Sequence, residues 1–188
     1  MDRYRGRIVM IGTLSTGIYG VGVPPVTSSY FNIASASGTG SSGVVTFDLT
    51  SVTGYKHLQL RIMGLQSTGN DIFIKVNSDA GVRGHWMQGN GSAASAGSET
   101  GTSDGQYFGT FGWNATYPSV WIVDVLDYTS TTKTKTIRSF GGYDANGSGR
   151  VNLISSLFTT TSAITSITFT SGNSFSSTSR FAIYGIKD

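Results

Sequence analysis

The sequence contains no cysteine and only 3 prolines in 188 residues, and charged residues make up only 12% of it. The absence of cysteine excludes disulfide bonds, thiol catalysis and cysteine-based zinc sites. The 3 prolines and the irregular spacing of the glycines exclude a collagen-like repeat. A net charge of +3 is unlike the highly charged composition of disordered chains. We therefore expect a folded chain held together by its apolar core and its assembly partners.

Glycine, serine, threonine and β-branched residues are abundant. The chain has 26 glycines, serine and threonine supply about a quarter of its residues, and 38% of the residues are hydrophobic. Residues that favour helices are scarce, which excludes a helical bundle, whereas β-branched and aromatic residues favour strands. No run of about 18 apolar residues is present, so we predict no membrane span. These observations predict one all-β domain with short strands and small-residue loops.

Alternating apolar and polar residues begin after Gly43. Three segments place their apolar side chains on one face, at residues 45–49, 58–62 and 72–76. Residues 121–126 are apolar on both faces, which is typical of a central strand, and residues 133–140 carry alternate charges, which is typical of an edge strand. Further strands are expected near the C-terminus, at residues 151–153, 164–169 and 180–186. About eight strands with regular turns predict an antiparallel β-sandwich.

Residues 1–40 are predicted to form an N-terminal arm for attachment or oligomerisation, before a sandwich domain at residues 41–188. The arm begins with three arginines and a short apolar run, and its candidate attachment residues are Arg3, Tyr4, Arg5, Arg7, Ile8 and Ile11. The basic residues suit phosphates or an acidic protein surface, and a solvated tail is an equally good interpretation. The rest of the chain is close to neutral, so we expect no nucleic-acid partner. Residues 89–105 are predicted to be a long surface loop.

Motifs that suggest chemistry lack the context that the chemistry requires. The G-x-G-x-x-G pattern at residues 38–43 precedes a predicted strand instead of the helix that a nucleotide site needs. The G-x-S-x-G pattern at residues 101–105 lies in the predicted loop, and His57 and His85 are interpreted as structural or surface residues. A calcium-loop pattern from Asp144 lacks its final glutamate. We predict no catalytic residue, no metal site and no cofactor, with a glycosidase built from two distant carboxylates left open.

Aromatic residues gather between Trp86 and Trp121. Aromatic rings fill cores and subunit interfaces, and they also stack on sugar rings. We favour a core or interface role for this group. As candidates for a glycan site or an interface, we single out Trp86, Tyr107 and Trp113.

Four stretches follow one another in order through residues 44–188: residues 56–61 (KHLQLR), 74–79 (IKVNSD) followed by 88–92 (QGNGS), 128–139, and 163–168 leading to 179–187. Taken together they resemble small structural proteins of tailed bacteriophages. Residues 1–40 lie outside the resemblance. Because several separated stretches match in sequence order, the resemblance is more specific than any single motif.

The resemblance implies a jelly-roll sandwich on the virion, either as a decoration or cement protein of the head or as part of a fibre. It implies a homo-oligomer, which we expect to be a trimer, and it implies the major capsid or tail protein as a further partner. It carries no catalytic residues. The alternative function is a receptor-binding module that holds a host surface glycan, and an enzyme acting on surface polysaccharide is a third, more distant one. Neither a membrane nor nucleic acid is an expected partner.

Overall fold

A computed structural model describes residues 29–66, 68–103, 105–111 and 116–187. The described residues form no helix that could cross a membrane. They form twelve strands: β1 (Tyr30–Ser37), β2 (Val44–Asp48), β3 (His57–Gly64), β4 (Asn70–Val76), β5 (Arg83–Gly89), β6 (Ala94–Thr100), β7 (Gln106–Phe111), β8 (Ser119–Val125), β9 (Lys135–Asp144), β10 (Gly149–Phe158), β11 (Ser166–Ser171) and β12 (Arg180–Ile186).

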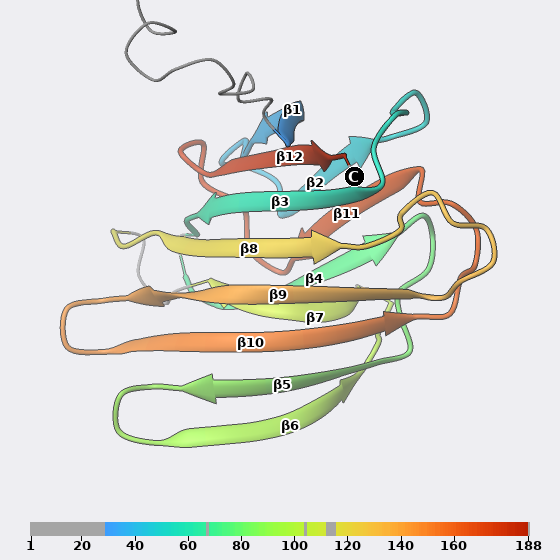
Figure 1. Ribbon diagram of the computed structural model, residues 1–188. Coiled ribbons are helices and arrows are strands. Elements are labelled where there is room, and N and C mark those ends of the chain that lie inside the picture. Colours follow the sequence, from blue (N-terminus) through green and yellow to red (C-terminus); the bar gives the residue numbers. More distant parts are fainter. Residues whose placement is uncertain (1–28, 67, 104, 112–115, 188) are drawn as a thin grey trace, which may run out of the picture.

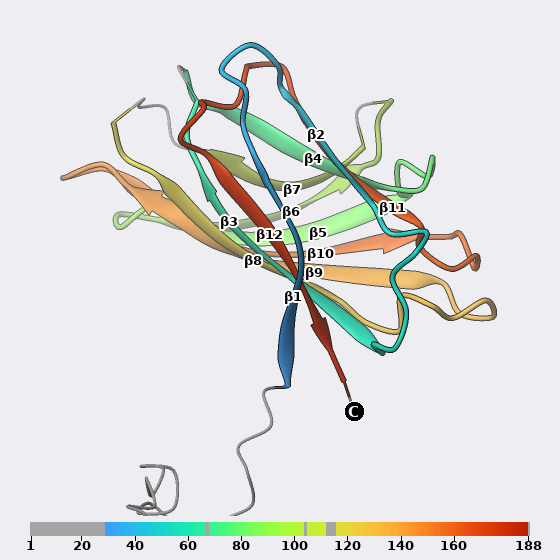
Figure 2. The ribbon, with the colours of Figure 1, turned by 90° about the horizontal axis from the view of Figure 1, so that it is seen from above.

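The strands make two antiparallel sheets that pack face to face. The large sheet has eight strands in the order β1-β12-β3-β8-β9-β10-β5-β6, and the small sheet has four in the order β2-β11-β4-β7. Figure 1 shows the large sheet in front of the small one, and Figure 2 shows the two layers from above. This confirms the prediction of an all-β, antiparallel sandwich.

Eight of the strands are wound as a jelly roll. The pairs are nested along the chain, with β1 beside β12, β2 beside β11, β3 beside β8 and β4 beside β7. Folding this nested ribbon over itself gives the four-stranded groups β1-β12-β3-β8 and β2-β11-β4-β7. That winding is the jelly-roll arrangement, in which two Greek keys share one core.

Two hairpins are added to the jelly roll. The β5–β6 hairpin lies between β4 and β7 in the chain, and the β9–β10 hairpin lies between β8 and β11. β10 pairs with β5, so the two hairpins lie side by side and widen the large sheet from four strands to eight. We call these four strands the extension. The sequence-based count of about eight strands was therefore too low.

The core lies between the sheets and is built from the alternating residues that the sequence shows. Trp121 on β8 is its largest buried side chain. The ring of Trp121 packs edge-on against Phe108 of β7, with 5.6 Å between ring centroids. A Cβ atom on Gly109 or Gly141 would lie 2.6 Å or less from the Trp121 ring, so glycine at these two positions makes room for it. The large side chain and the two small residues thus specify how β7 packs on the large sheet.

Two sequence predictions about the extension were wrong. Residues 133–140 were expected to form an edge strand, but β9 lies between β8 and β10, because the inserted hairpins cover that edge. Residues 89–105 were expected to form a loop, but they contain β6, which pairs with β5 along its whole length. β6 consists mainly of alanine, serine and glycine, and its strand conformation is set by backbone pairing, which leaves no apolar pattern in the sequence.

The sheet begins inside the segment that the sequence analysis assigned to the arm. β1, at residues 30–37, pairs with β12 and forms one edge of the large sheet. The predicted attachment residues Arg3, Tyr4, Arg5, Arg7, Ile8 and Ile11 lie outside the described residues. A truncation that tests the arm must therefore end before Tyr30 if the sandwich is to stay intact.

Candidate functional site

The outer face of the large sheet carries two adjacent rows of apolar and small residues. Strand register defines each row, because residues paired across neighbouring strands point to the same side of the sheet. The first row is Ile122, Phe140, Leu153, Met87 and Ala96. The second row is Val120, Gly142, Val151, Gly89 and Ala94. We call these ten residues the apolar face.

The large side chains of the apolar face are open to solvent. Their relative exposures are 62% for Met87, 57% for Val120, 56% for Phe140 and 55% for Val151. Leu153 and Ile122 are also exposed, at 49% and 41%. Single exposed apolar residues are ordinary, but a contiguous patch that crosses several strands marks an interaction surface in a soluble protein.

The apolar face is hollowed over its glycines. One hollow of about 660 Å³ is lined in part by Val120, Gly142 and Val151, and a second of about 570 Å³ by Met87 and Leu153. Both hollows share Gly89, Phe140 and Val151. The face therefore presents projecting side chains and depressions beside each other, which a complementary surface can fill.

Charged residues border the apolar face on two sides. On β3, Arg61 lies directly opposite Ile122 of the first row. In the next row of the sheet Asp124 of β8 lies directly opposite Arg138 of β9. The side-chain amide of Gln59 donates a hydrogen bond to Asp124 Oδ1 over 3.0 Å. Asp124 and Arg138 carry opposite charges, Arg61 adds a positive charge at the β3 margin, and the ten residues of the apolar face carry none. A polar rim around an apolar centre is typical of protein interfaces.

The structure places two of the three singled-out aromatic residues on the opposite side of the large sheet. Trp86 pairs with the buried Ile154, so its side chain points toward the small sheet, where the ring covers Gly97. Tyr107 lies on β7 of the small sheet and faces this same inner side. Its hydroxyl accepts a hydrogen bond from Asn152 Nδ2 of β10 over 3.1 Å. Trp113 lies outside the described residues. Both described rings pack against the core.

The hydroxyl of Tyr107 is already used within the chain. It lies 3.0 Å from Thr110 Oγ1, which donates to Asp71 Oδ1 over 2.9 Å. Tyr107 therefore donates to Thr110 and accepts from Asn152. Burial raises the pKa of the Tyr107 phenol, which keeps this hydroxyl protonated. The ring and its hydrogen bonds connect β7 to the extension, which is a structural role.

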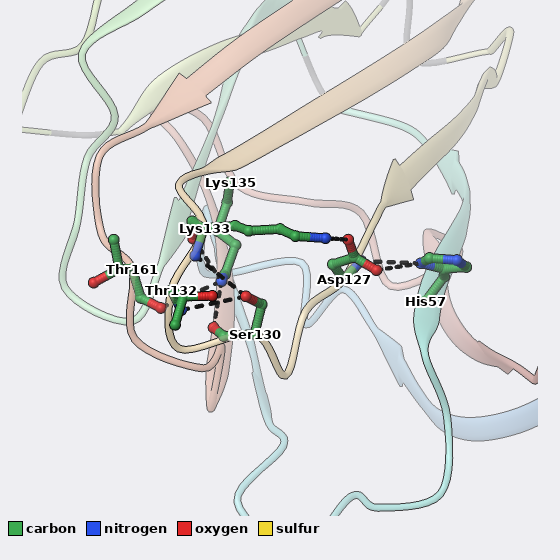
Figure 3. Close-up of polar contacts among 7 residues, drawn as sticks. All are labelled: His57, Asp127, Ser130, Thr132, Lys133, Lys135 and Thr161. Atoms are coloured by element: carbon green, nitrogen blue, oxygen red, sulfur yellow. Dashed lines mark hydrogen bonds and ion pairs between the residues drawn. The ribbon is translucent and has the colours of Figure 1, made fainter.

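The described residues offer no catalytic arrangement around the histidines. His57 Nδ1 accepts a hydrogen bond from the backbone N–H of Asp127 over 2.9 Å, and Asp127 forms an ion pair with Lys133 over 2.7 Å (Figure 3). The hydrogen bond from Lys133 is the main cause that lowers the pKa of Asp127. His57 thus stabilises the turn after β8. His85 is exposed on the outer face of β5.

A buried lysine lies beside this turn. Lys135 is only 1% exposed, and its ammonium group donates to the backbone carbonyls of Ser130 and Lys133 over 2.6 and 3.0 Å, with a longer contact of 3.4 Å to Thr161 (Figure 3). Burial lowers the pKa of Lys135. The three carbonyls belong to the β8–β9 and β10–β11 loops, so Lys135 holds these two loops together.

No metal centre is formed by the part of the chain that the structure describes, because no group of three or more histidine and carboxylate side chains lies within reach of one ion. Within the G-x-S-x-G pattern, Thr102 and Gly105 exchange two backbone hydrogen bonds, and the strand β7 follows from Gln106 where a nucleophile elbow would have a helix. The apolar face is therefore the most distinctive surface among the described residues.

This face was not predicted from the sequence, although its signal is present there. The two-sided apolar pattern of residues 121–126 correctly indicated a central strand, since β8 lies between β3 and β9. However, Ile122 and Val120 are exposed, because no layer formed by the described residues covers the outer side of the large sheet. A strand with apolar residues on both faces therefore has two interpretations. Its second face is covered either by another layer of the same chain or by a partner.

The chain matches no protein-family model, and the search of curated proteins also found no match.

Proposed function

We propose that the chain is a non-enzymatic structural protein of a tailed-phage virion, an oligomeric surface component of the head or of a fibre. In this proposal the apolar face joins it to neighbouring subunits, and the N-terminal arm anchors it to the major capsid or tail protein. The observation that carries the proposal is the apolar face, which lies mostly on the extension and which the described residues leave uncovered. The resemblance of residues 44–188 to small phage structural proteins supplies the virion setting.

The position of the apolar face supports an assembly role. Most of the face lies on the extension, the part that this chain adds to the eight-stranded jelly roll. Binding surfaces are commonly built onto a fold in this way, because the core of the fold stays rigid while the additions vary. A rigid sandwich with an apolar outer sheet is suited to packing against other subunits.

The energy of such a contact suits a protein present in many copies. Burying the exposed half of six large side chains contributes about 5–9 kcal/mol from this chain alone, given about 1.5–3 kcal/mol for a whole side chain. Association costs about 4–15 kcal/mol in lost freedom of motion. The gain and the cost are of similar size, so one contact through this face is reversible, and it becomes more stable where the arm or further subunits hold the partners close together.

Incorporation into virus particles tests the proposal. A Phe140→Lys variant places a charge in the centre of the apolar face, and we expect its copy number in purified particles, measured by quantitative mass spectrometry, to fall at least tenfold. Val44→Lys is the matched control, because Val44 is 51% exposed on the small sheet, and we expect it to be incorporated normally. Absence of the wild-type chain from particles, or equal incorporation of both variants, contradicts the proposal.

The glycan-binding alternative has weaker structural support. Tyr107 uses its hydroxyl within the chain, and the Trp86 ring packs on Gly97 and the core. Sugar binding needs an open aromatic face with free polar groups beside it. A glycan-array signal from the intact chain that disappears in a Trp86→Ala variant would favour this alternative.

A further inference from the structure

We propose that the apolar face binds a second copy of this chain through a two-fold axis that runs across the strands, between the two rows of the face. This inference deepens the proposed function and rests on it for its biological role, but the contact itself is testable with the isolated chain. The occupant is inferred from the arrangement of large side chains and glycines on the face.

Large side chains and glycines alternate along two strands of the extension. On β9, Phe140 in the first row is followed two residues later by Gly142 in the second row. On β5, Met87 in the first row is followed by Gly89 in the second row. Side chains two residues apart on a strand point to the same side. Each of these strands therefore presents a projection and a depression next to each other.

A two-fold axis between the rows exchanges them. It places the first row of one copy over the second row of the other, so that Phe140 faces Gly142 and Met87 faces Gly89 of the second copy. Because the operation is symmetric, each copy fills the depressions of the other. Facing sheets lie about 10 Å apart, a distance that leaves room for one large side chain opposite a glycine.

The remaining strands fit the same arrangement. On β8 the exchange places Ile122 over Val120, and on β10 it places Leu153 over Val151. These four side chains are all branched and aliphatic, so each pair fills the space between the sheets with similar volume. The ten residues of the apolar face include no charged residue. Charges lie at its margins, where Arg61 of β3 stands opposite Ile122 and where Asp144 and Arg150 line the larger hollow, so a second copy over the extension keeps its centre free of charge. A charged partner surface gains nothing from such a face.

If two copies bind through this face, the chain forms a dimer and not the trimer that we expected from the sequence resemblance. Sedimentation equilibrium of the full chain, over a range of concentrations, measures this directly. We expect a reversible step from the 19.8 kDa chain to twice that mass, without a species of three chains. A chain that stays monomeric at millimolar concentration, or that forms only trimers, overturns the inference and leaves the proposed incorporation into particles standing.

Replacing a glycine of the face distinguishes a specific fit from non-specific hydrophobic association. Gly89→Leu fills a depression and makes the face more apolar, and a Cβ atom at this position has no neighbour closer than 4.0 Å within the chain. Non-specific association would become stronger in this variant, whereas the proposed contact becomes at least tenfold weaker, because Met87 of the second copy loses its space. Val44→Leu, on the small sheet, is expected to leave the dissociation constant unchanged. Unchanged or stronger pairing of Gly89→Leu overturns the inference.

Cysteine cross-linking tests the orientation, and the absence of native cysteine makes the reaction selective. The two-fold axis brings Leu153 of one copy over Val151 of the other. A mixture of a Leu153→Cys chain and a Val151→Cys chain, treated with a short bis-maleimide, is expected to give mainly the mixed product. Preferential linking of identical chains contradicts the proposed axis.

Discussion

Replacing Trp121 with alanine is expected to lower the free energy of unfolding by about 3–5 kcal/mol, the cost of removing a large buried aromatic side chain. Trp121 is 1% exposed, packs against Phe108, and occupies space that Gly109 and Gly141 leave open. The neighbouring strands cannot close the cavity without moving the two sheets relative to each other. Urea denaturation followed by circular dichroism measures the change.

The adjacent residue provides the control for Trp121. Ile122 lies on the same strand but points outward and is 41% exposed, so we expect Ile122→Ala to cost about 1 kcal/mol or less in dilute solution, as surface substitutions do. Equal losses for the two variants would show that the outer side of β8 is covered within the single chain. That result would remove the basis for the apolar face.

Replacing Lys135 with methionine is expected to cost about 1.5–3 kcal/mol, the contribution of hydrogen bonds made by a charged donor, because the loop carbonyls lose the ammonium group that binds them. The carbonyls of Ser130 and Lys133 receive the shortest hydrogen bonds from Lys135. Lys133→Met is the matched control, since the Lys133 side chain is 66% exposed and its ion pair with Asp127 is a surface pair worth about 0–1 kcal/mol. Thermal and urea unfolding at pH 7 distinguish the two variants.

Lys135 also predicts a dependence of stability on pH. Burial lowers its pKa in the folded chain, while the unfolded chain keeps the ordinary value of 10.5. Between these two values the unfolded state binds more protons, so the contribution of Lys135 to stability rises as the pH increases through that interval. We therefore expect the stability difference between wild type and Lys135→Met to grow as the pH approaches 10.5. A constant or shrinking difference contradicts the burial of the ammonium group.

Much of the jelly roll was predictable from local alternation. The segments at 45–49, 58–62 and 72–76 place their apolar side chains on one face in the structure, as expected. Each of these strands has one side in the core, so apolar and polar residues alternate along its sequence. The all-β class followed from composition for the same reason.

The extension was not predictable by the same means, because its strands are specified by their neighbours. β6 has a nearly featureless sequence and depends on backbone pairing with β5, while the charges of β9 suggested an edge that the inserted hairpin covers. Lys135 reads as a surface lysine in the sequence, and its burial depends on loop carbonyls that are distant along the chain, such as that of Thr161.

The apolar face was visible in the sequence but was interpreted as internal. The pattern of β8 shows apolar residues on both sides of the strand, with Asp124 as an exception on the outer side, and it does not show whether a layer of the same chain or a partner covers each side. Only the order of strands in the two sheets settles this point, since the small sheet covers one side of the large sheet and the described chain leaves the other open. The opposite holds for two of the glycan candidates. Trp86 and Tyr107 were considered for a surface site, and the structure packs both against the core.

The most direct test of the assembly role is the reactivity of single cysteines before and after assembly. Leu153→Cys on the apolar face and Val44→Cys on the small sheet start from similar exposures, 49% and 51%, and the chain has no other thiol. In the dilute chain we expect a maleimide reagent to label both at similar rates. In assembled particles we expect the cysteine at 153 to be protected at least tenfold while the cysteine at 44 still reacts. Equal labelling of the two positions in particles would contradict the account.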